Sequence, residues 1–297
     1  MTAPDLVPSR DLAALLSSAS VEVSSRGHQL AELRDHFAPG TDVTITFLPG
    51  DNYRHNVEAA TALRHAGYNP VPHIAAREMA SREALDDFLA RLRGQADVTR
   101  ILLISGDTAL ARGPFKSSLD VCASGLLEAR SIARLSVAGH PEGHPYLETA
   151  EALDVLDGWR EWGRQRNIQV EAMTQFCFES APIMGWIDGL QARRIQLPVI
   201  VGLAGPATPA TLMKFALRCG VGNSMRAVRS QIGRFGRLLT DTGPDEIMRG
   251  LQSAPEAATA VIAGFHLFPF GGLRKSAEWM RSYGQATQRS AAVVNPT

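Results

Sequence analysis

Short apolar or alternating runs recur along the chain, and nearly every one is followed by a segment whose apolar residues lie three or four positions apart. The short runs end at glycine, proline or polar residues, which is typical of strands that stop at turns. The eight predicted strands span residues 20–24, 43–48, 70–75, 100–105, 135–138, 171–178, 198–203 and 260–268.

The segments between these runs have helical periodicity. In segment 81–92, Ser81 can cap a helix whose apolar side chains follow the i, i+3, i+4, i+7 spacing of one buried face. The other predicted helices span residues 8–18, 53–66, 119–132, 149–162, 180–193 and 273–282. Several further helical pieces fall within 207–254, so extra helices are expected between the seventh and eighth strands.

Alternation of strands and helices predicts a parallel sheet, and eight such units in 297 residues fit a closed (β/α)8 barrel of the α/β class, the TIM barrel. An open doubly wound sheet is the alternative, but it usually carries a glycine-rich phosphate loop after its first strand. Residues 24–28, Ser-Ser-Arg-Gly-His, contain no such motif. We therefore predict a single barrel domain over residues 1–297, with a tail frayed from about residue 288.

The composition narrows the classes of partner. Thirty basic and thirty acidic residues cancel, so charge gives no reason to expect a nucleic-acid or membrane-surface partner. The N-terminus has no secretory pattern, and no apolar run is long enough to cross a bilayer. Three widely spaced cysteines fit reduced thiols in a cytoplasmic protein. The sequence does not fix the oligomeric state, and a homo-oligomer is one possibility.

Residues 135–145 join a predicted strand to the polar segment Gly139-His-Pro-Glu-Gly-His-Pro145. The two prolines make a helix through His140 and His144 unfavourable, because each lacks a backbone N–H. Two histidines four residues apart suggest a metal site, but the shared helix face of such sites is missing and no third ligand is evident. We therefore expect ligand contacts or structural hydrogen bonds here, and no metal.

Polar residues also end other predicted strands, and a barrel would bring them to one mouth. Glu22, between two valines, is either an inward acid with a raised pKa or the partner of a core arginine. Asp107 is either a ligand-binding acid or a helix cap. Gln175 suits the edge of a heteroaromatic ring, or else it satisfies the backbone. His266 and Cys177 are expected to be core residues, the cysteine packing between two phenylalanines.

Three segments resemble signature sequences of the methylenetetrahydrofolate reductase family, in the family's order and approximate spacing. They are Ile101-Leu-Leu-Ile-Ser-Gly-Asp107, Val137-Ala-Gly-His-Pro-Glu-Gly-His-Pro145 and Met173-Thr-Gln-Phe-Cys-Phe178. Three shorter segments, Val21-Glu-Val23, Pro72-His73 and Phe265-His-Leu-Phe268, resemble further parts of the family. The resemblance therefore spans about residues 20–270.

The resemblance implies a (β/α)8 barrel that binds FAD at the carboxyl ends of its strands. It also implies an oxidoreductase of one-carbon metabolism and methionine biosynthesis, which reduces 5,10-methylenetetrahydrofolate to 5-methyltetrahydrofolate with NADH or NADPH, or runs in reverse. Hydride passes from NAD(P)H to the flavin N5 and on to the methylene carbon. A glutamic acid first protonates the leaving nitrogen, which opens the substrate to a 5-iminium cation.

Site roles follow from the same resemblance. Glu22 matches the glutamic acid, Asp107 matches an aspartate that favours the iminium charge and lies near flavin and folate, and Gln175 matches the amide that holds the pterin. Arg164 is aligned with a phosphate-binding lysine. The positions of flavin contacts are occupied by Thr46, His73, Asp107, Ala138, His140 and Asp157.

The chain departs from the family at several of these positions. The usual Arg-Gly-Asp is Ser105-Gly-Asp107, and the stacking phenylalanine falls near Pro209. These changes affect FAD binding more than folate chemistry, so weak or absent FAD with direct hydride transfer from NADH is one expectation. Two alternatives remain: a folate-binding methyltransferase acting with a cobalamin protein, and a non-catalytic partner subunit.

Overall fold

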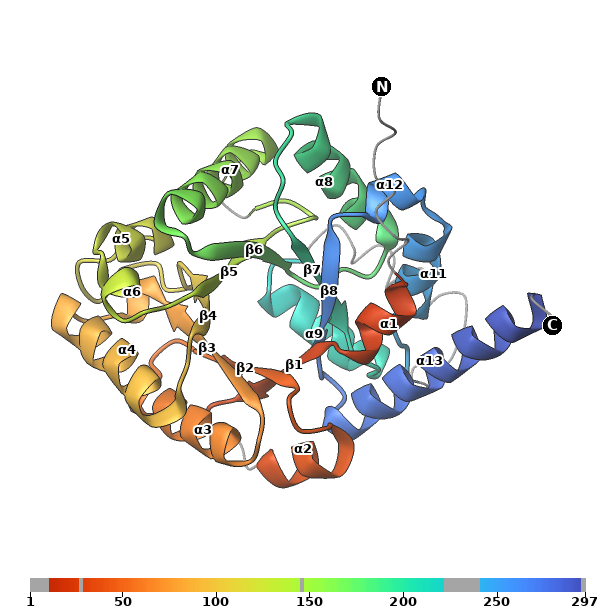
Figure 1. Cartoon of the computed structure of the whole chain (residues 1–297), viewed down its shortest axis with the longest axis horizontal. Coiled ribbons are helices and arrows are strands. Elements are labelled where there is room, and N and C mark those ends of the chain that lie inside the picture. The colour runs from red at the N-terminus through yellow and green to blue at the C-terminus, as the bar shows by residue number, and fades with distance from the viewer. Residues whose placement is uncertain (1–10, 27–28, 145–146, 222–240, 295–297) are drawn as a thin grey trace.

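The computed structural model describes residues 11–26, 29–144, 147–221 and 241–294, with side chains in the last range described to residue 286. Eight parallel strands pair in sequence order, and β1 pairs with β8 to close the barrel (Figure 1). The predicted (β/α)8 fold is confirmed. The strands are β1 Ser20–Ser24, β2 Asp42–Thr46, β3 Asn69–Ala75, β4 Arg100–Ile104, β5 Arg134–Gly139, β6 Gln169–Thr174, β7 Val199–Ala204 and β8 Ile262–Phe268.

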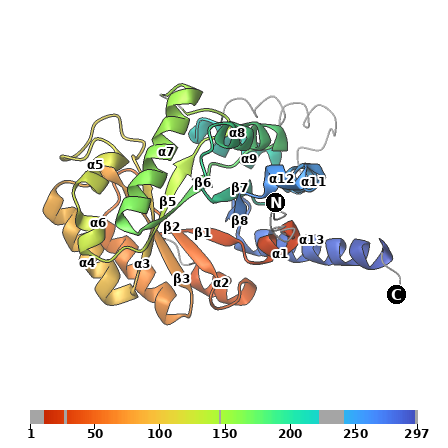
Figure 2. The same ribbon diagram turned by 45° about the horizontal axis from the view of Figure 1, so that its top comes forward.

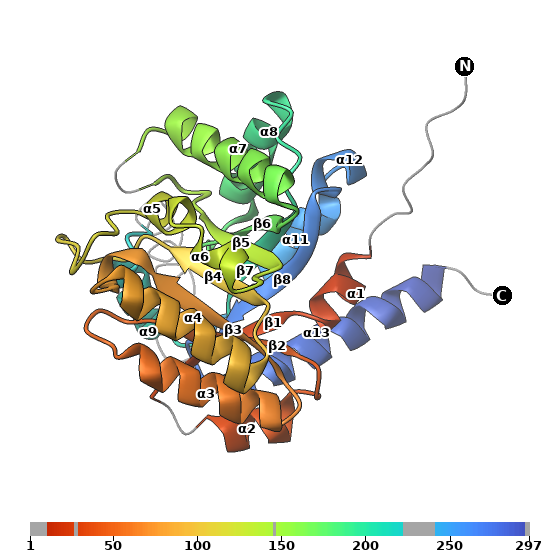
Figure 3. The same cartoon turned by 60° about the vertical axis from the view of Figure 1, so that its left-hand side comes forward.

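Helices surround this barrel, and α3 and α4 lie side by side on its outer surface (Figures 1 and 3). The last helix, α13, packs against α1 and then extends beyond the barrel (Figures 2 and 3). The helices are α1 Leu12–Ser17, α2 Leu30–His36, α3 Tyr53–His65, α4 Arg82–Ala96, α5 Ser118–Ala123, α6 Leu126–Ala129, α7 Thr149–Arg166, α8 Ser180–Ala192, α9 Pro209–Arg218, α11 Asp245–Ser253, α12 Glu256–Thr259 and α13 Leu273–Val294. Helices α9, α11 and α12 lie between β7 and β8, as predicted.

Several predicted boundaries were wrong. The helix expected over 119–132 is two short helices, α5 and α6, because Gly125 adopts a positive φ of 71° that no helix interior contains. Helix α7 continues past residue 162 to Arg166, where Asn167 ends it in the left-handed conformation. The final helix continues past 282 to Val294, strand β6 ends at Thr174 instead of 178, and α2 was not predicted.

Alternation along the strands divides their side chains between two environments. On β1, Val21 and Val23 belong to the main core, which lies between the barrel and its helices. Ser20 and Glu22 have the opposite parity and face the barrel interior, where they meet side chains of β8 and β3. On the other side of the interior, Leu102, Met173 and Ile200 form an apolar cluster. Beyond the amino end, the interior therefore has a polar half on the side of β8 through β3 and an apolar half on the side of β4, β6 and β7.

An ion-pair network lies at the amino end of the barrel. The carboxylate of Glu171, only 2% exposed, accepts hydrogen bonds from Arg100, Arg134 and the hydroxyl of Ser136. Arg100 also donates to Asp42 at the start of β2. Each guanidinium in this network therefore has a carboxylate partner. This end of a TIM barrel usually serves stability, and the network fits that role.

One glycine of β7 is required by close packing. A Cβ added to Gly202 would lie 2.3 Å from the carbonyl oxygen of Thr174 and 2.8 Å from Cε2 of Phe268. Gly202→Ala should therefore lower the free energy of unfolding by about 1–3 kcal/mol, as overpacked core substitutions do. Gly158→Ala is the matched control, because an added Cβ there meets no atom within 4 Å and Gly158 lies inside α7. It should raise stability by about 0.5–1 kcal/mol. Urea denaturation of both variants checks the prediction, and an unchanged Gly202→Ala midpoint would contradict it.

Candidate functional site

Glu22 occupies the mouth of the barrel. Its side chain is 19% exposed, and burial raises the pKa of its carboxyl to about 7. The imidazole of His73 lies beside it, with Nε2 3.8 Å from Oε2 of Glu22. Within the described residues no arginine pairs with Glu22, so the structure does not support the alternative of a core ion pair. An acid with this pKa can donate a proton near neutral pH.

Two buried histidines lie in the polar half of the interior with Glu22. Burial lowers the pKa of His73 to about 4 and that of His266 to about 3, and a neighbouring His73 charge contributes to the second shift. Nδ1 of His266 is 2.8 Å from the hydroxyl of Ser20, which partly confirms its expected core role. Both imidazoles are therefore neutral at pH 7, so neither supplies a positive charge that would hold Glu22 ionised.

Asp107 lies at the same end of the barrel, three residues beyond the end of β4. It is exposed, and the turn before it requires the positive φ of Gly106. The next helix along the chain, α5, is capped by Ser117, so Asp107 does not serve as its cap. The sequence suggested either a helix cap or a ligand-binding acid at Asp107. With the cap excluded for α5, the ligand-binding interpretation remains.

Cys219, at the end of α9, is a third titratable group at this end of the barrel, with Glu22 and Asp107. Burial, with smaller contributions from the charges of Glu22 and Asp107, raises the pKa of its thiol to about 11. The thiol packs against the phenylalanines at the ends of β6 and β8, at the same end of the barrel where β1 and β4 end. Side chains from β1, from the loop after β4 and from α9 therefore share one neighbourhood. Cys219 was not recognised in the sequence, where nothing distinguishes it from the other two cysteines.

Gln175 directly follows β6, and its position is fixed by the backbone. Its N–H donates to the carbonyl of Gly139, and its side-chain Oε1 accepts from the N–H of Phe176 at 3.1 Å. The backbone-satisfying reading therefore holds for the oxygen. The side-chain NH2 group makes no hydrogen bond within the described residues and can donate to a ligand.

Three further predicted residues lie at the carboxyl ends of β2 and β5. Thr46 is the last residue of β2, and its carbonyl accepts from the buried side chain of Asn56. Ala138 is half-buried on β5, opposite Met173 of β6. His140 follows β5, and its ring meets His144 edge-on at 4.7 Å. Burial and the charge of His144 lower the pKa of His140 to about 4. The structure places no helix across His140 and His144, although Pro145 lies outside the described residues.

The remaining two predicted residues do not join the mouth. Asp157 lies in the middle of the outer helix α7 and accepts from Arg160 at 2.8 Å. Arg164 lies two residues before the end of α7, which leads back to the start of β6 at the amino end of the barrel. Its guanidinium pairs with Glu161. Arg164 therefore lies at the end opposite to Glu22 and Asp107.

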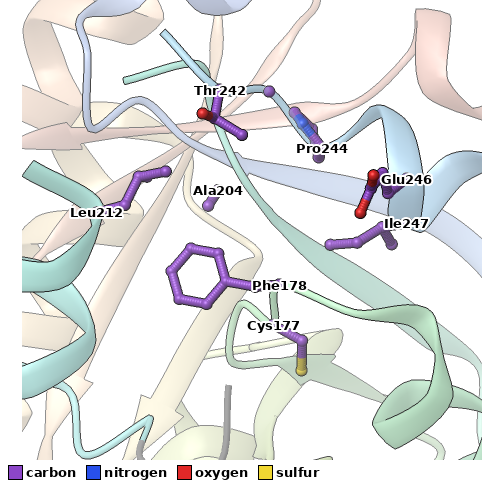
Figure 4. A pocket seen from close by; sticks show the side chains of 9 residues that line it. Cys177, Phe178, Ala204, Leu212, Thr242, Pro244, Glu246 and Ile247 are labelled. Atoms are coloured by element: carbon purple, nitrogen blue, oxygen red, sulfur yellow. The ribbon is translucent and has the colours of Figure 1, made fainter. Parts of the chain in front are cut away.

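A small cavity beside the mouth has a different character. It lies between Cys177, Phe178 and the start of α11, and it has room for about one water molecule (Figure 4). Burial raises the pKa of the Cys177 thiol well above its usual range, with a hydrogen bond and charge from Glu142 adding to the effect. Cys177 is thus a core thiol, as expected, and the cavity is too small for an organic ligand.

Other classes of site receive no support within the described residues. No group of three histidine, cysteine, aspartate or glutamate side chains there could hold a metal ion. Among the same residues, no helix combines the length and the apolar character that crossing a bilayer requires. The mouth instead offers one protonatable carboxyl, one exposed carboxylate and one amide donor. Together they could bind a polar heterocycle and transfer a proton to it.

Comparison with known proteins supports the fold. No protein-family model matches the chain. A solved structure that is similar is described as an uncharacterized protein from Clostridium thermocellum that binds two copies of 5-methyl-5,6,7,8-tetrahydrofolic acid. Its TM-score is 0.59 at 10% sequence identity, over 90% of this chain and 94% of that chain. At this identity the likeness shows a shared fold, and membership of the reductase family is not confirmed.

Proposed function

We propose that the protein binds a tetrahydrofolate derivative at the carboxyl end of the barrel and reduces 5,10-methylenetetrahydrofolate to 5-methyltetrahydrofolate with NAD(P)H. The observation that carries the proposal is Glu22, a single acid with a pKa of about 7 in the mouth that Asp107 also borders. The sequence resemblance names the same residues. The folate bound by the similar Clostridium protein adds support for the ligand class.

The chemistry assigns one role to each polar group. Glu22 donates its proton to N10 of the folate as the bond between N10 and the methylene carbon breaks, which leaves a 5-iminium cation. The carboxylate of Asp107 stabilises that positive charge. Hydride from the dihydronicotinamide then adds to the methylene carbon, so the products are the N5-methyl folate and NAD(P)+. Gln175 holds the edge of the pterin through its available NH2 group.

The residues that the resemblance assigns to FAD fit only part of that cofactor. Thr46, His73 and Ala138 lie on strands whose carboxyl ends meet at the mouth, where an isoalloxazine ring could bind. A diphosphate needs cationic or N–H donors, but Ser105 replaces the usual arginine and Arg164 lies at the opposite end of the barrel. Because these residues do not fit the whole group, the proposal takes hydride directly from NAD(P)H.

An anaerobic assay tests the proposal. The purified protein, mixed with NADH or NADPH and 5,10-methylenetetrahydrofolate, should oxidise the nicotinamide and release 5-methyltetrahydrofolate in equal amounts. A visible absorption scan of the same sample reports whether flavin is present. No folate-dependent oxidation with either nucleotide, in either direction of the reaction, would refute the proposed activity.

The pH dependence of the reaction follows from Glu22. The protonated carboxyl is the donor, and its pKa is about 7, so the donor form dominates below that pH and is lost above it. We expect kcat/KM to be level at acidic pH and to fall about tenfold per pH unit above about pH 7. The dependence of kcat/KM on pH, measured over a range in which the enzyme stays folded, checks this expectation. A rate that rises through the same range would contradict an acid role for Glu22.

A second candidate is folate-dependent methyl transfer to a corrinoid protein. The 5-methyl folate bound by the similar Clostridium protein is the product of the reduction, but it is equally a methyl donor. The two candidates differ in reductant, because methyl transfer consumes no NAD(P)H. Formation of methylcobalamin from 5-methyltetrahydrofolate and reduced cobalamin, without nicotinamide oxidation, would favour this second function.

A further inference from the structure

Five phenylalanines gather at the carboxyl ends of β6, β7 and β8, outside the main core. Phe176 is buried at the centre of this group and meets Phe178, Phe268 and Phe270 edge-on, with ring centroids 4.8 to 5.6 Å apart. Phe270 stacks on Phe215 of α9 at 4.1 Å with 15° between the ring planes, and on Phe268 at 5.8 Å and 21°. We call the three nearly parallel rings Phe215, Phe268 and Phe270 the aromatic stack. Each is half-buried.

Phe268 places this stack next to Glu22. Strands β8 and β1 pair Ser20 with His266 and Val21 with Leu267, so the next residues in this register are Glu22 and Phe268. Both have the inward parity of Ser20 and His266, whose side chains meet inside the barrel. The ring of Phe268 lies over Gly202 of β7, which has no side chain to displace it. It therefore occupies the interior, one strand from the acid.

A second contact relates the stack to both carboxyl groups. Cys219 packs against the same phenylalanine cluster, and the charges of Glu22 and Asp107 both reach its thiol. Gln175 directly precedes Phe176, and the backbone N–H of Phe176 holds the amide oxygen of Gln175. Glu22 and Gln175 are thus each next to a member of the phenylalanine cluster, one by strand register and the other by sequence. A flat ring that binds Glu22 would lie beside Phe268.

We infer that the pterin ring of the reduced folate packs face to face with Phe268, with Phe270 and Phe215 stacked behind it as support. The inference rests on the proposed function and identifies the aromatic surface of its folate-binding site. The face of an aromatic ring attracts cations, so Phe268 would also favour the 5-iminium charge that forms when N10 is protonated. It would replace the phenylalanine that the resemblance expects near Pro209.

The test compares Phe268→Leu with two other variants. Leucine keeps an apolar side chain but removes the ring face, so affinity for the pterin should fall about tenfold. Phe268→Tyr keeps the ring and should bind as the wild type does. Phe178→Leu is the matched control: Phe178 belongs to the same cluster but lines the small cavity by α11 (Figure 4), so its loss should leave affinity unchanged. Thermal melting of each variant confirms folding.

Two probes locate the contact. Anaerobic calorimetry measures binding of 5-methyltetrahydrofolate and of a tetrahydropterin that lacks the aminobenzoyl-glutamate tail. We expect Phe268→Leu to weaken both probes by the same factor. If the variant binds both as the wild type does, or loses affinity for the whole folate only, the inference is overturned while the proposed function stands. If the wild type binds neither probe, the proposed function fails and the inference fails with it.

Discussion

Glu22→Gln should lower the rate of methylene-folate reduction by about 100- to 10,000-fold, the usual contribution of a general acid. Glutamine has nearly the same shape but cannot donate a proton of suitable acidity to N10. Because the binding contacts are assigned to Gln175 and the aromatic stack, affinity for 5-methyltetrahydrofolate should stay close to that of the wild type. Steady-state kinetics and anaerobic calorimetry on the same preparation measure both quantities.

Glu78→Gln is a suitable control for this prediction. Glu78 is also buried at the carboxyl end of the barrel, but its carboxylate already accepts from the N–H of Gly50 and from Arg112. The control should retain its activity, whereas the pH dependence expected above about pH 7 should vanish in Glu22→Gln. Full activity in Glu22→Gln would rule out the acid role and, with it, the main support for the proposed reaction.

Glu171→Ala should produce the largest loss of stability, about 3–5 kcal/mol in the free energy of unfolding. Removing this buried carboxylate leaves Arg100, whose side chain is 13% exposed, with only Asp42 as a charged partner, and it leaves Arg134 without its partner. Urea denaturation measures the loss. If the alanine variant does not fold, Glu171→Gln keeps the shape of the side chain and should show a smaller loss in the same direction.

The control for Glu171 is an exposed pair. Glu161 and Arg164 form a surface ion pair on α7, and Glu161→Gln should leave the unfolding midpoint unchanged. Variants of the two interior glutamates should also differ in activity. Because Glu171 lies at the amino end, away from the mouth, folded Glu171→Gln should keep the reductase activity that Glu22→Gln loses. Loss of activity in both variants at equal stability would mean that the two ends of the barrel are not functionally distinct.

Some residues of the mouth could be predicted from the sequence, because a barrel of parallel strands places all of its strand ends on one face. Glu22, Asp107 and Gln175 each sit at or just beyond the end of a predicted strand, and parallel strands bring such ends together. Arg164 shows the limit of this reasoning, because an alignment by resemblance ignores which end of a helix faces the mouth. The direction of α7 decides the position of Arg164. The helix runs back toward the amino end of the barrel, and Arg164 lies in its last turn, away from the mouth.

The aromatic stack and the amino-end network could not be predicted. Phe215 and Phe270 are 55 positions apart in the sequence, yet their rings stack at 4.1 Å. Arg100 and Glu171 are separated by 71 positions. Neither pair has a local pattern, since each depends on the register between strands and on the side of the barrel that each strand joins.

The sequence by itself determined the eight strands, most of the helices and the barrel, because hydrophobic periodicity and turn residues act over a few positions. Helix ends were less certain, as Gly125 shows, because a single backbone conformation can divide a periodic segment. Only the tertiary structure decided which side chains meet inside the barrel. Closure between β1 and β8 is what places Phe268 beside Glu22, and that pairing depends on interactions across the whole chain.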